Sequence, residues 1–524
     1  IEKNNMKRRE ILKATILGSG AAALGSIATE KNQAQQTLAT NVTQQNSIDI
    51  LIIGAGNAGM PTAIEAADLG GKVMLIDKNS FVGGMLIVSG GHVSGANSKL
   101  QMRKGIQDSY EQHYQDAMRI GRFKANSELL KLATENAAQM IDWLEEIGVE
   151  FTDESPFLED DHDHYSVPRT YVGNNLARSL LGPLQKELDK RIERGNLDLR
   201  LETTALNLLQ DEKEKVIGVR VRDKAGRDSN IYATTVILTT GGYGANKIMQ
   251  QQYNPRVVPA KWIGLPHATG DGIRMAKGVG AKLAGMDHLV SFPGTVYDLR
   301  GFPTSISTRL QFPPEHYTQS IWVNKKGQRF VNEHTTPDNR EVEFLEQPEL
   351  SFFVVYDENI RQQPGTLDIG DRSRAEMDQE ITRGGIIAQA DTLRQLAGKI
   401  GISSTGLIAT INQYNDDIAT KMSDQYGRTR QRKKIGKPPF YAFRVGGSIL
   451  ITHGGVAVNH SLEVIDHNGK VIPGLYAAGE VMGCGRLMGG GVVSGMSVGP
   501  AVTFGRIVAR TAYRYAQSQC LKTI

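Results

Sequence analysis

A glycine-rich turn between a strand and a helix constrains the fold of this chain more than any other feature. Residues 48–53 form an apolar, β-rich run, which is followed at once by Gly54, Gly56 and Gly59 in the spacing GxGxxG. A helix-forming stretch comes next, and the following strand, KVMLI, ends at Asp77. The spacing alone is weak evidence, but in this strand–turn–helix context it predicts a Rossmann-type dinucleotide site.

Each residue of this motif has its own role in binding a dinucleotide. Gly54 allows the tight turn, Gly56 lets the backbone approach the pyrophosphate, and Gly59 lets the helix pack on the strand. The helix N-terminus offers N–H donors and the positive end of its dipole. Asp77 would bind the ribose hydroxyls, which favours a nucleotide with a free 2′-OH. The alternative is a glycine-rich turn that binds no ligand.

Composition narrows the classes of function. A chain of 524 residues is too long for one core, so we expect two or three packed units. The 60 Lys and Arg against 56 Asp and Glu are nearly balanced, and without a basic face or an RNA-reading motif they give no support for nucleic-acid binding. Because Cys484 and Cys520 are the only cysteines, a cysteine-held iron–sulfur cluster and a CxxCH haem site are excluded. Redox chemistry here must use a cofactor held without cysteines.

Residues 1–46 are expected to be an export signal and linker outside the fold. Arg8-Arg9 and the weakly apolar Gly/Ala stretch behind them resemble a twin-arginine signal, with an acceptable cleavage site at Ser26-Ile27-Ala28. This predicts a periplasmic protein; the alternative is a disordered tail that contains two arginines. The Gly/Ala stretch is too short to span a bilayer and no other apolar run is long enough, so we expect no stable membrane insertion.

Further glycine-rich turns recur along the chain. They are FVGG at 81–84, SGG at 89–91, VILTTGGYG at 236–244, HATGDGIRMA at 267–276 and IPGLYAAGE at 472–480. Near the C-terminus, Gly499-Pro500-Ala501 starts the final predicted helix. A nicotinamide enzyme needs no such return of the C-terminal segment to the dinucleotide site, so the pattern favours FAD.

The order of these motifs, from Ser47 to about Tyr515, resembles the flavoprotein family of soluble fumarate reductases, with 3-ketosteroid dehydrogenases as more distant relatives. The resemblance implies an α/β fold: a discontinuous Rossmann-like FAD-binding domain at 47–290 and 451–515, interrupted by an α+β capping domain at 291–450. It also places Glu480 on the FAD ribose or ribityl chain, and the helix start at 499–501 near the pyrimidine edge of the flavin.

The predicted cofactor-binding residues come from the glycine turns, the acidic strand ends and the last helix start. They are Gly54, Gly56, Asn57, Ala58, Gly59, Asp77, Lys78, Gly83, Gly84, Ser89, Gly90, Gly91, Gly241, Asp271, Glu480, Ser497, Pro500 and Ala501. Covalent members of the family attach FAD through a histidine at the position of Gly84, so we predict non-covalent FAD. His92, beyond that turn, is expected to be a solvated loop residue.

The resemblance also implies a substrate site where the cap meets the flavin. The segments Thr452-His453-Gly454-Gly455 and Gly485-Arg486-Leu487 match those that hold a substrate carboxylate in fumarate reductases. An imidazole and a guanidinium supply the charge and donors that a carboxylate or carbonyl needs. The alternatives are a histidine bonded to backbone at the domain joint and an arginine in a structural ion pair.

Two departures from the family argue against fumarate or succinate as substrate. A second substrate histidine is replaced by Phe292, and the catalytic arginine is replaced by Pro337, which has no side-chain proton. The late tyrosine of ketosteroid enzymes falls near Met488, so that activity is not supported either. With Phe292, Leu487 and Met488 at the site, we predict a larger, less polar substrate with one carboxylate or carbonyl handle.

Carbon protonation still requires a donor. His334, Asp338 and Arg340 surround the vacant position, with Tyr297 and Tyr317 upstream, and Arg340 is the first choice. Together with Arg486 and His453 it completes the predicted catalytic set. Arg169 is a candidate for a further anion contact.

Two charged segments of the chain are expected to be solvated. The run Asp161-His162-Asp163-His164 looks like a metal cluster, but it lacks a second ligand group elsewhere, so we predict no metal. The basic loop at 421–434 within the cap is expected to be exposed, and helical runs are expected before it, at 388–400 and 405–420.

Three functions remain open from the sequence: an exported FAD-dependent ene-reductase, which is favoured; a dehydrogenase of a cyclic ketone or acid; and a non-catalytic, electron-carrying flavoprotein subunit. No haem motif and no covalent-FMN motif occurs in this sequence, so a separate electron-transfer protein is the predicted partner.

Overall fold

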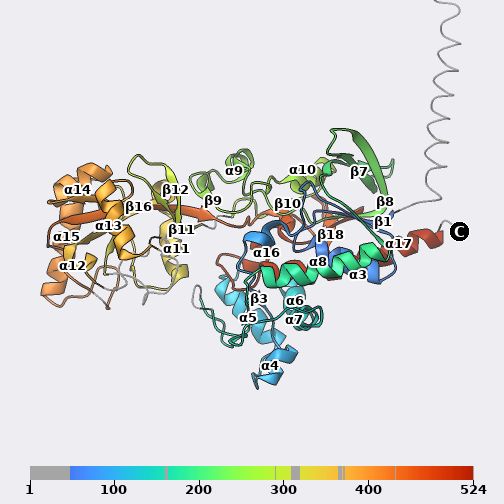
Figure 1. Ribbon diagram of the computed structural model, residues 1–524, viewed down its shortest axis with the longest axis horizontal. Coiled ribbons are helices and arrows are strands. Elements are labelled where there is room, and N and C mark those ends of the chain that lie inside the picture. Colours follow the sequence, from blue (N-terminus) through green and yellow to red (C-terminus); the bar gives the residue numbers. More distant parts are fainter. Residues whose placement is uncertain are drawn as a thin grey trace, which may run out of the picture. The chain divides into compact units, whose positions relative to one another are not determined.

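The computed structural model describes residues 48–159, 163–288, 291–307, 319–363, 369, 372–430 and 432–522. The predicted export signal lies outside these residues, as do Asp161, His162 and Tyr317. The described chain is mixed α/β, with an eight-stranded sheet and a separate seven-stranded sheet (Figure 1). This confirms the predicted fold class.

The eight-stranded sheet forms around the apolar run that opens the described chain. β1 (Ile48–Ile53) lies between β2 (Val73–Ile76) and β8 (Asp228–Leu238), and its last four residues are buried. A continuous apolar run is typical of a strand covered on both faces, which explains why β1 is central. The full order is β18-β19-β8-β1-β2-β5, with β6 and β7 attached beside β8. The remaining bounds are β5 (Leu197–Arg200), β6 (Thr204–Gln210), β7 (Val216–Arg222), β18 (Glu463–Ile465) and β19 (Val471–Ala477).

Two long-range contacts bring the C-terminal part of the chain back to this sheet. β19 pairs in parallel with β8, with Leu475 opposite Val236. The last helix, α17 (Val498–Lys522), packs against α3 (Gly59–Asp68), the helix that follows the glycine turn (Figure 1). The glycine turns from both ends of the sequence therefore meet at one place.

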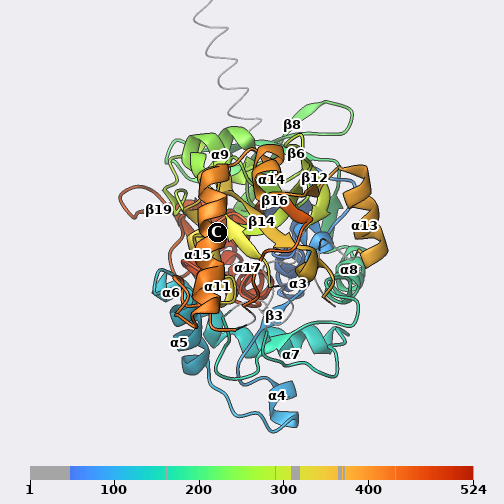
Figure 2. The same cartoon turned by 90° about the vertical axis from the view of Figure 1, so that its left-hand side faces the viewer.

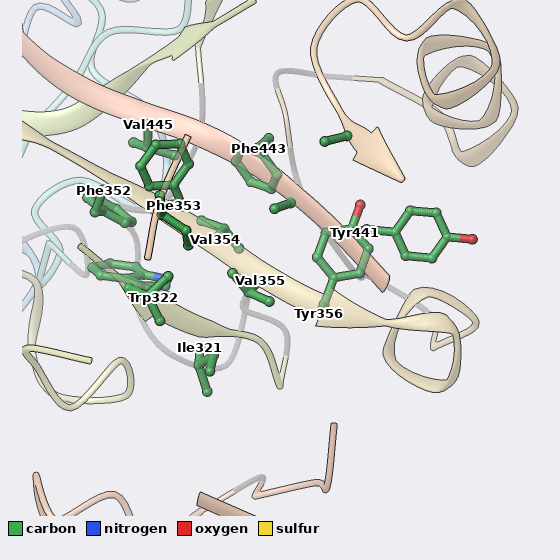
Figure 3. Packing of buried hydrophobic residues seen from close by; sticks show 14 of the residues in the cluster. Ile321, Trp322, Phe352, Phe353, Val354, Val355, Tyr356, Tyr441, Phe443 and Val445 are labelled. Atoms are coloured by element: carbon green, nitrogen blue, oxygen red, sulfur yellow. The ribbon is translucent and has the colours of Figure 1, made fainter. Parts of the chain in front are cut away.

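The seven-stranded sheet is mainly antiparallel and carries its own core. Its order is β12-β11-β16-β14-β13, with β15 and β9 also paired to β16. Trp322 stacks on Phe352 with ring centroids 4.6 Å apart, inside a cluster of aromatic and β-branched side chains from β13, β14 and β16 (Figure 3). The bounds are β9 (Lys261–Trp262), β11 (Phe292–Tyr297), β12 (Pro303–Ser307), β13 (Ile321–Val323), β14 (Ser351–Asp357), β15 (Ala388–Ala390) and β16 (Phe440–Ile449).

Helices and short strands complete the described fold. The helices are α4 (Lys99–Arg103), α5 (Tyr110–Ile120), α6 (Ser127–Glu135), α7 (Ala137–Glu146), α8 (Arg178–Glu193), α9 (Lys247–Tyr253), α10 (Asp271–Gly278), α11 (Pro337–Leu345), α12 (Glu358–Arg361), α13 (Arg374–Arg383), α14 (Leu393–Ile400), α15 (Ser404–Ala419) and α16 (Gly485–Met488). Two-residue strands are β3 (Val93–Ser94), β4 (Thr170–Tyr171), β10 (Leu283–Ala284) and β17 (Gly455–Val456). None of the helices in the described ranges is both long and apolar enough to cross a membrane.

One predicted helix starts later than expected. Residues 388–390 form strand β15, which pairs with β16, and α14 begins only at Leu393. Thr392 and Gln395 form a capping box at that helix start, which fixes the boundary locally. α14 packs against α15 and β16 (Figure 2).

A buried ionic network joins segments of the chain near the seven-stranded sheet. Arg329 binds the Glu333 carboxylate through two nitrogens and Asp424 through a third, at 2.6–2.8 Å. Arg428 donates to Glu333 as well, at 3.1 Å. Burial alone would raise the pKa of Glu333, but the two guanidinium groups outweigh it and lower that pKa to about 2.

The prediction that the basic loop at 421–434 is a solvated surface is therefore wrong for two of its residues. Asp424 is buried and Arg428 is fully buried, because both belong to this network. The sequence of a charged segment does not show which of its side chains pair with a buried residue on a distant strand or loop.

Candidate active site

The structure contains a cavity at the carboxyl end of β1 and β2. Ten of the predicted cofactor-binding residues line it: Gly54, Gly56, Asn57, Ala58, Asp77, Lys78, Gly84, Gly241, Asp271 and Glu480. Ligands of doubly wound α/β proteins bind at this edge of the sheet. The glycine turn and the acidic strand end thus lie together, as the sequence pattern predicts.

The three glycines of the turn differ in what a side chain would contact. At Gly54 the backbone has φ +107°, and a Cβ would lie 2.5 Å from the Thr239 oxygen. At Gly59 a Cβ would collide with the Gly54 oxygen, which explains the close packing of α3 on β1. At Gly56 the nearest heavy atom of the protein is 4.0 Å away, because this position faces the cavity.

Asp77 braces the glycine turn from the end of β2. Its carboxylate accepts hydrogen bonds from the backbone N–H groups of Ala55, at 2.7 Å, and Asn79, at 2.8 Å. Only 9% of the residue is exposed, and it also lines the cavity. The carboxylate is therefore held in a fixed position at the place where a ribose would bind.

Lys78 and Asp271 form an ion pair on the cavity wall. The Lys78 ammonium lies 2.6 Å from the Asp271 carboxylate and 2.7 Å from the Thr269 hydroxyl. Burial by itself would raise the pKa of Asp271, but the bond and charge of Lys78 outweigh it and hold the pKa below its usual range. The pair links the strand end at Lys78 to the start of α10.

A second cavity, of about 330 Å³, adjoins the first. Asn57, Met85 and Glu480 line both cavities. Four further predicted cofactor residues, Ser89, Gly90, Ser497 and Ala501, line the second one. The N-terminal residue of α17, Val498, also faces it, so the helix starts at this cavity as predicted.

Four predicted cofactor residues line neither cavity: Gly59, Gly83, Gly91 and Pro500. Gly59 allows the close packing of α3 on β1. A Cβ at Gly83 (φ +110°) would touch Leu181, and one at Gly91 (φ +75°) would lie 2.6 Å from Ala177. Pro500 lies in the first turn of α17. These residues shape the turns and the helix start without facing the cavities.

These two cavities fit an FAD molecule. The first offers backbone at Gly56 and Gly241 with no side chain in the way, an aspartate at the strand end, and a helix N-terminus. The second continues from it through shared lining residues and receives the start of α17. A dinucleotide with a large ring system requires such a pair of connected spaces.

Glu480 lies between the two cavities. Its carboxylate accepts hydrogen bonds from the backbone N–H and the hydroxyl of Thr452, at 2.7 and 2.9 Å. Burial raises the pKa of Glu480, while the two bonds from Thr452 act in the opposite direction. Glu480 therefore fixes the segment that carries His453 next to the cofactor cavity.

The lining of the second cavity is mostly apolar, and most of its titratable residues are acidic. The apolar part includes Phe292, Met488 and the run Ile449-Leu450-Ile451. The titratable residues are Glu159, Glu341, Glu480 and His92; among the described residues that line it there is no lysine or arginine. Phe292 and Met488, predicted at the substrate site from sequence, do lie together here.

His92 is one of the residues that line the second cavity. Its Nε2 lies 3.5 Å from the carboxylate of Glu159 on the same wall. Its ring also contacts Phe157 edge-on. Its side chain is 36% exposed and lies in a loop, as expected for a solvated loop histidine, but it also lines the cavity.

The structure brings the segments of His453 and Arg486 together. The backbone N–H of Gly485 donates to the His453 carbonyl at 3.1 Å, and that of Cys484 donates to Thr452 at 3.0 Å. His453 is 3% exposed, and neither ring nitrogen has a hydrogen-bond partner in the described part of the chain. Burial, with a smaller effect from His288, lowers its pKa to about 3, so the ring is neutral.

Arg486 is half-buried on α16 and has no ion pair or side-chain hydrogen bond with any described residue. Burial lowers the pKa of its guanidinium. Neither Arg486 nor His453 lines the second cavity, but Met488, on the same short helix as Arg486, does. The alternative of a structural ion pair for Arg486 therefore finds no partner within these ranges.

Arg340 lies away from the second cavity. It is 1% exposed, its guanidinium lies 5.7 Å from the centre of the Trp322 ring, and it donates to the Glu333 carbonyl at 3.4 Å. The neighbouring Glu341, which the sequence analysis did not consider, lines the cavity instead. A helix that begins at Pro337 puts Glu341 on the same face, four residues on, and that spacing was the available signal.

Arg169 is a structural residue. It is fully buried, binds Asp108 through two nitrogens at 2.7 and 2.9 Å, and binds Asp116 at 2.6 Å. The hypothesis of a further substrate anion contact at Arg169 is therefore wrong, because its charge is already paired. Across the described ranges, no group of three or more His, Cys, Asp or Glu side chains is placed to hold a metal ion.

Comparison with known proteins agrees with this site. A family model described as an FAD binding domain matches residues 49–498. "Probable fumarate reductase Ifc3" of Shewanella frigidimarina is 29% identical over 489 residues, which are 93% of this chain and 78% of that protein. A urocanate reductase of Eggerthella lenta is 29% identical over 92% of this chain and 76% of its own length. Among solved structures, the open conformation of a flavocytochrome c3 fumarate reductase matches with a TM-score of 0.69 and 28% identity, over 92% of this chain and 81% of that one.

Proposed function

The chain belongs to the FAD binding domain family and is a fumarate reductase-like flavoprotein, an FAD-dependent oxidoreductase that acts on CH–CH bonds. From this premise, we propose that it reduces a C=C bond conjugated to one carboxylate or carbonyl group. The proposed substrate is larger and less polar than fumarate. When bound, FAD supplies the hydride chemistry.

The composition of the second cavity carries this proposal. Fumarate is a small dianion, and a site for it needs cationic groups at both ends. The described lining has no cation, three carboxyl groups and an apolar wall that includes Phe292 and Met488. This environment offers no lysine or arginine to pair with a second negative charge, and it favours an apolar body instead.

The single anionic or carbonyl handle is assigned to Arg486, with His453 in support. Arg486 carries a charge that no described carboxylate neutralises, and both ring nitrogens of the buried His453 lack partners in the described chain. Buried polar groups are normally hydrogen-bonded, so a missing ligand group is the simplest partner for them. A planar guanidinium gives two parallel bonds to a carboxylate.

We expect the wild-type enzyme, assayed anaerobically with a reduced dye, to reduce an aryl- or alkyl-substituted enoate with a kcat/KM at least about tenfold above that for fumarate. The reason is that the apolar wall binds the substituent, while the second carboxylate of fumarate finds no lysine or arginine on the described lining. A panel of enoates and enones, with succinate as a test of the reverse reaction, measures this. Equal or better turnover of fumarate would contradict the substrate class.

The electrons are proposed to come from a separate electron-transfer protein, since the sequence holds two cysteines and no CxxCH haem motif. We also propose a periplasmic location through the twin-arginine route, on the basis of Arg8-Arg9.

Replacing Arg8 and Arg9 by lysine should leave the protein in the cytoplasm, folded and loaded with flavin, because the twin-arginine pathway reads the paired guanidinium groups. Cell fractionation and flavin absorbance measure the outcome. The appearance of the double-lysine variant in the periplasm at the wild-type level would rule out this route.

A further inference from the structure

Reduction of a C=C bond, the proposed function on which this inference rests, needs hydride at one carbon and a proton at the other. The proton requires a donor in the protein. Pro337 has no side-chain proton, and Arg340 is placed against Trp322, away from the second cavity. The donor must therefore be another group of the cavity wall. We infer that Glu341 is the catalytic acid that protonates the substrate carbon.

The other titratable residues of the wall are already engaged. Glu480 accepts two hydrogen bonds from Thr452, which hold its carboxylate between the cavities. The Nε2 atom of His92 lies 3.5 Å from the carboxylate of Glu159, so these two side chains contact each other. Glu341 makes no hydrogen bond or ion pair with the described residues, although it is only 6% exposed. A buried carboxyl without a partner, on the wall of a substrate cavity, is a group held ready for a ligand.

The geometry of α11 explains why Glu341 rather than Arg340 reaches the cavity. Successive residues of an α-helix are turned by about 100° around the axis. Arg340 faces the Trp322 side, where it contacts the aromatic core of the cap. Glu341 faces the other way, one turn beyond Pro337, and Phe292 and Met488 lie on the same cavity wall.

The surroundings of Glu341 keep the proton on its carboxyl group. Burial is the largest cause of a pKa well above the ordinary range of glutamate, and the nearby carboxylate of Asp338 adds to it. Arg340 on the same helix and Arg122 from the segment after α5 act in the opposite direction, and Asp163 from a neighbouring loop acts with Asp338. Across the cavity the other titratable side chains are His92 and Glu159. Burial dominates and raises the pKa of Glu341, which favours the protonated carboxyl group over the carboxylate.

Asp338 is suited to pass protons toward Glu341. It is buried in the first turn of α11, and its Oδ2 accepts the backbone N–H of Asp163. Burial and the charge of Asp163 raise its pKa to about 6, so it exchanges protons near neutral pH. Its neighbour Asp163 is partly exposed and provides contact with water.

The reaction balances with Glu341 in this role. One carbon of the double bond receives hydride, with its electron pair, from the reduced cofactor, whose electrons come from the separate electron-transfer protein. The other carbon forms a C–H bond with the Glu341 proton as the carboxyl O–H bond breaks. The product is saturated, and the remaining Glu341 carboxylate recovers a proton from water.

The decisive variant is Glu341→Gln, with Glu343→Gln as the matched control, because Glu343 lies on the same helix but is exposed. We expect Glu341→Gln to lower kcat for the best enoate by about 10²- to 10⁴-fold. Flavin content and the substrate concentration that perturbs the flavin spectrum should stay within a few-fold of wild type. Glu341→Asp should restore part of the activity, and Glu343→Gln should match wild type.

A second measurement needs no turnover. In the folded wild type Glu341 keeps its proton, while in the unfolded chain a glutamate loses it near pH 4.3. Wild-type Tm should therefore fall, relative to Glu341→Gln, as the pH rises from about 5 through the raised pKa of Glu341, and the difference should become independent of pH at the acid end. In Glu343→Gln the Tm difference from wild type should not change with pH.

The two measurements separate the possible failures. If wild type reduces an enoate and Glu341→Gln retains kcat within about threefold, Glu341 is not the donor. A Tm difference between wild type and Glu341→Gln that is constant with pH would show an ionised, structural Glu341 and also overturn the inference. A wild type that reduces no enoate or enone would overturn the proposed function itself, and the pH dependence of Tm would still report the protonation of Glu341.

Discussion

The variant Gly56→Val should fold and bind no FAD. At this position a Cβ meets no protein atom closer than 4.0 Å, so the branched side chain does not disturb the turn itself. It extends into the first cavity, where the cofactor's pyrophosphate approaches the backbone most closely. The variant should purify colourless, with flavin affinity reduced by about 10²-fold or more.

This variant separates an effect on cofactor binding from an effect on folding, whereas substitutions at the neighbouring glycines cannot. Substitution at Gly54 or Gly59 would collide with backbone and unfold the region as well. Gly398→Val is the matched control: it lies on the exposed face of α14 with no heavy atom within 4 Å, and it should bind flavin normally.

Circular dichroism of the colourless Gly56→Val protein confirms the fold, and flavin titration measures the loss of affinity. A yellow Gly56→Val protein with wild-type affinity would place the cofactor elsewhere. Acid treatment of wild type should release unmodified FAD, as the glycine at position 84 predicts.

The second large effect is expected at Arg486. Removal of its guanidinium leaves the substrate's carboxylate or carbonyl without a charged partner in a partly desolvated place. Arg486→Ala should therefore lose about 2–5 kcal/mol of transition-state stabilisation, or about 10²-fold or more in kcat/KM. Arg486→Lys should recover little, since an ammonium cannot give two parallel bonds.

The same series tests whether Arg486 acts on the substrate or on the fold. The side chain makes no ion pair among the described residues, so its removal leaves no buried carboxylate behind, and FAD content and Tm should remain near wild type. Arg394→Ala, at an exposed position of α14, serves as the control and should keep full activity. His453→Ala should cost less and mainly raise KM. A loss of flavin in Arg486→Ala that parallels the loss of activity would argue for a structural role instead.

Local sequence signals predicted the cofactor half of this protein well. The spacing of Gly54 to Gly59, the strand end at Asp77 and the helix start at Gly499-Pro500 each depend on a few adjacent residues whose backbone requirements are strict. Such requirements are visible in sequence because only glycine tolerates the φ of Gly54 or the packing at Gly59. They fixed the fold class, and through the order of motifs they indicated FAD.

The roles of the arginines, by contrast, depended on which distant segment supplies a carboxylate partner. Arg169 and Arg428 look like available cations in sequence, but the fold pairs them with Asp108 and Asp116 in one case and Glu333 in the other. Arg486 looks no different, and only the tertiary structure leaves it without a carboxylate among the described residues. Pairing is decided by contacts between residues far apart in the chain, which no local pattern records.

The sequence by itself therefore determined a Rossmann-like FAD flavoprotein with Phe292 and Pro337 in place of polar family residues. Only the tertiary structure decided which side chains line the second cavity. His92 and Glu341 do so, whereas Arg340 lies against Trp322. The physical reason is the direction in which each side chain leaves its helix or loop. A turn of about 100° per residue on α11 sends one side chain into the aromatic core of the cap and the next into the cavity, and the packing of the cap sheet fixes which is which.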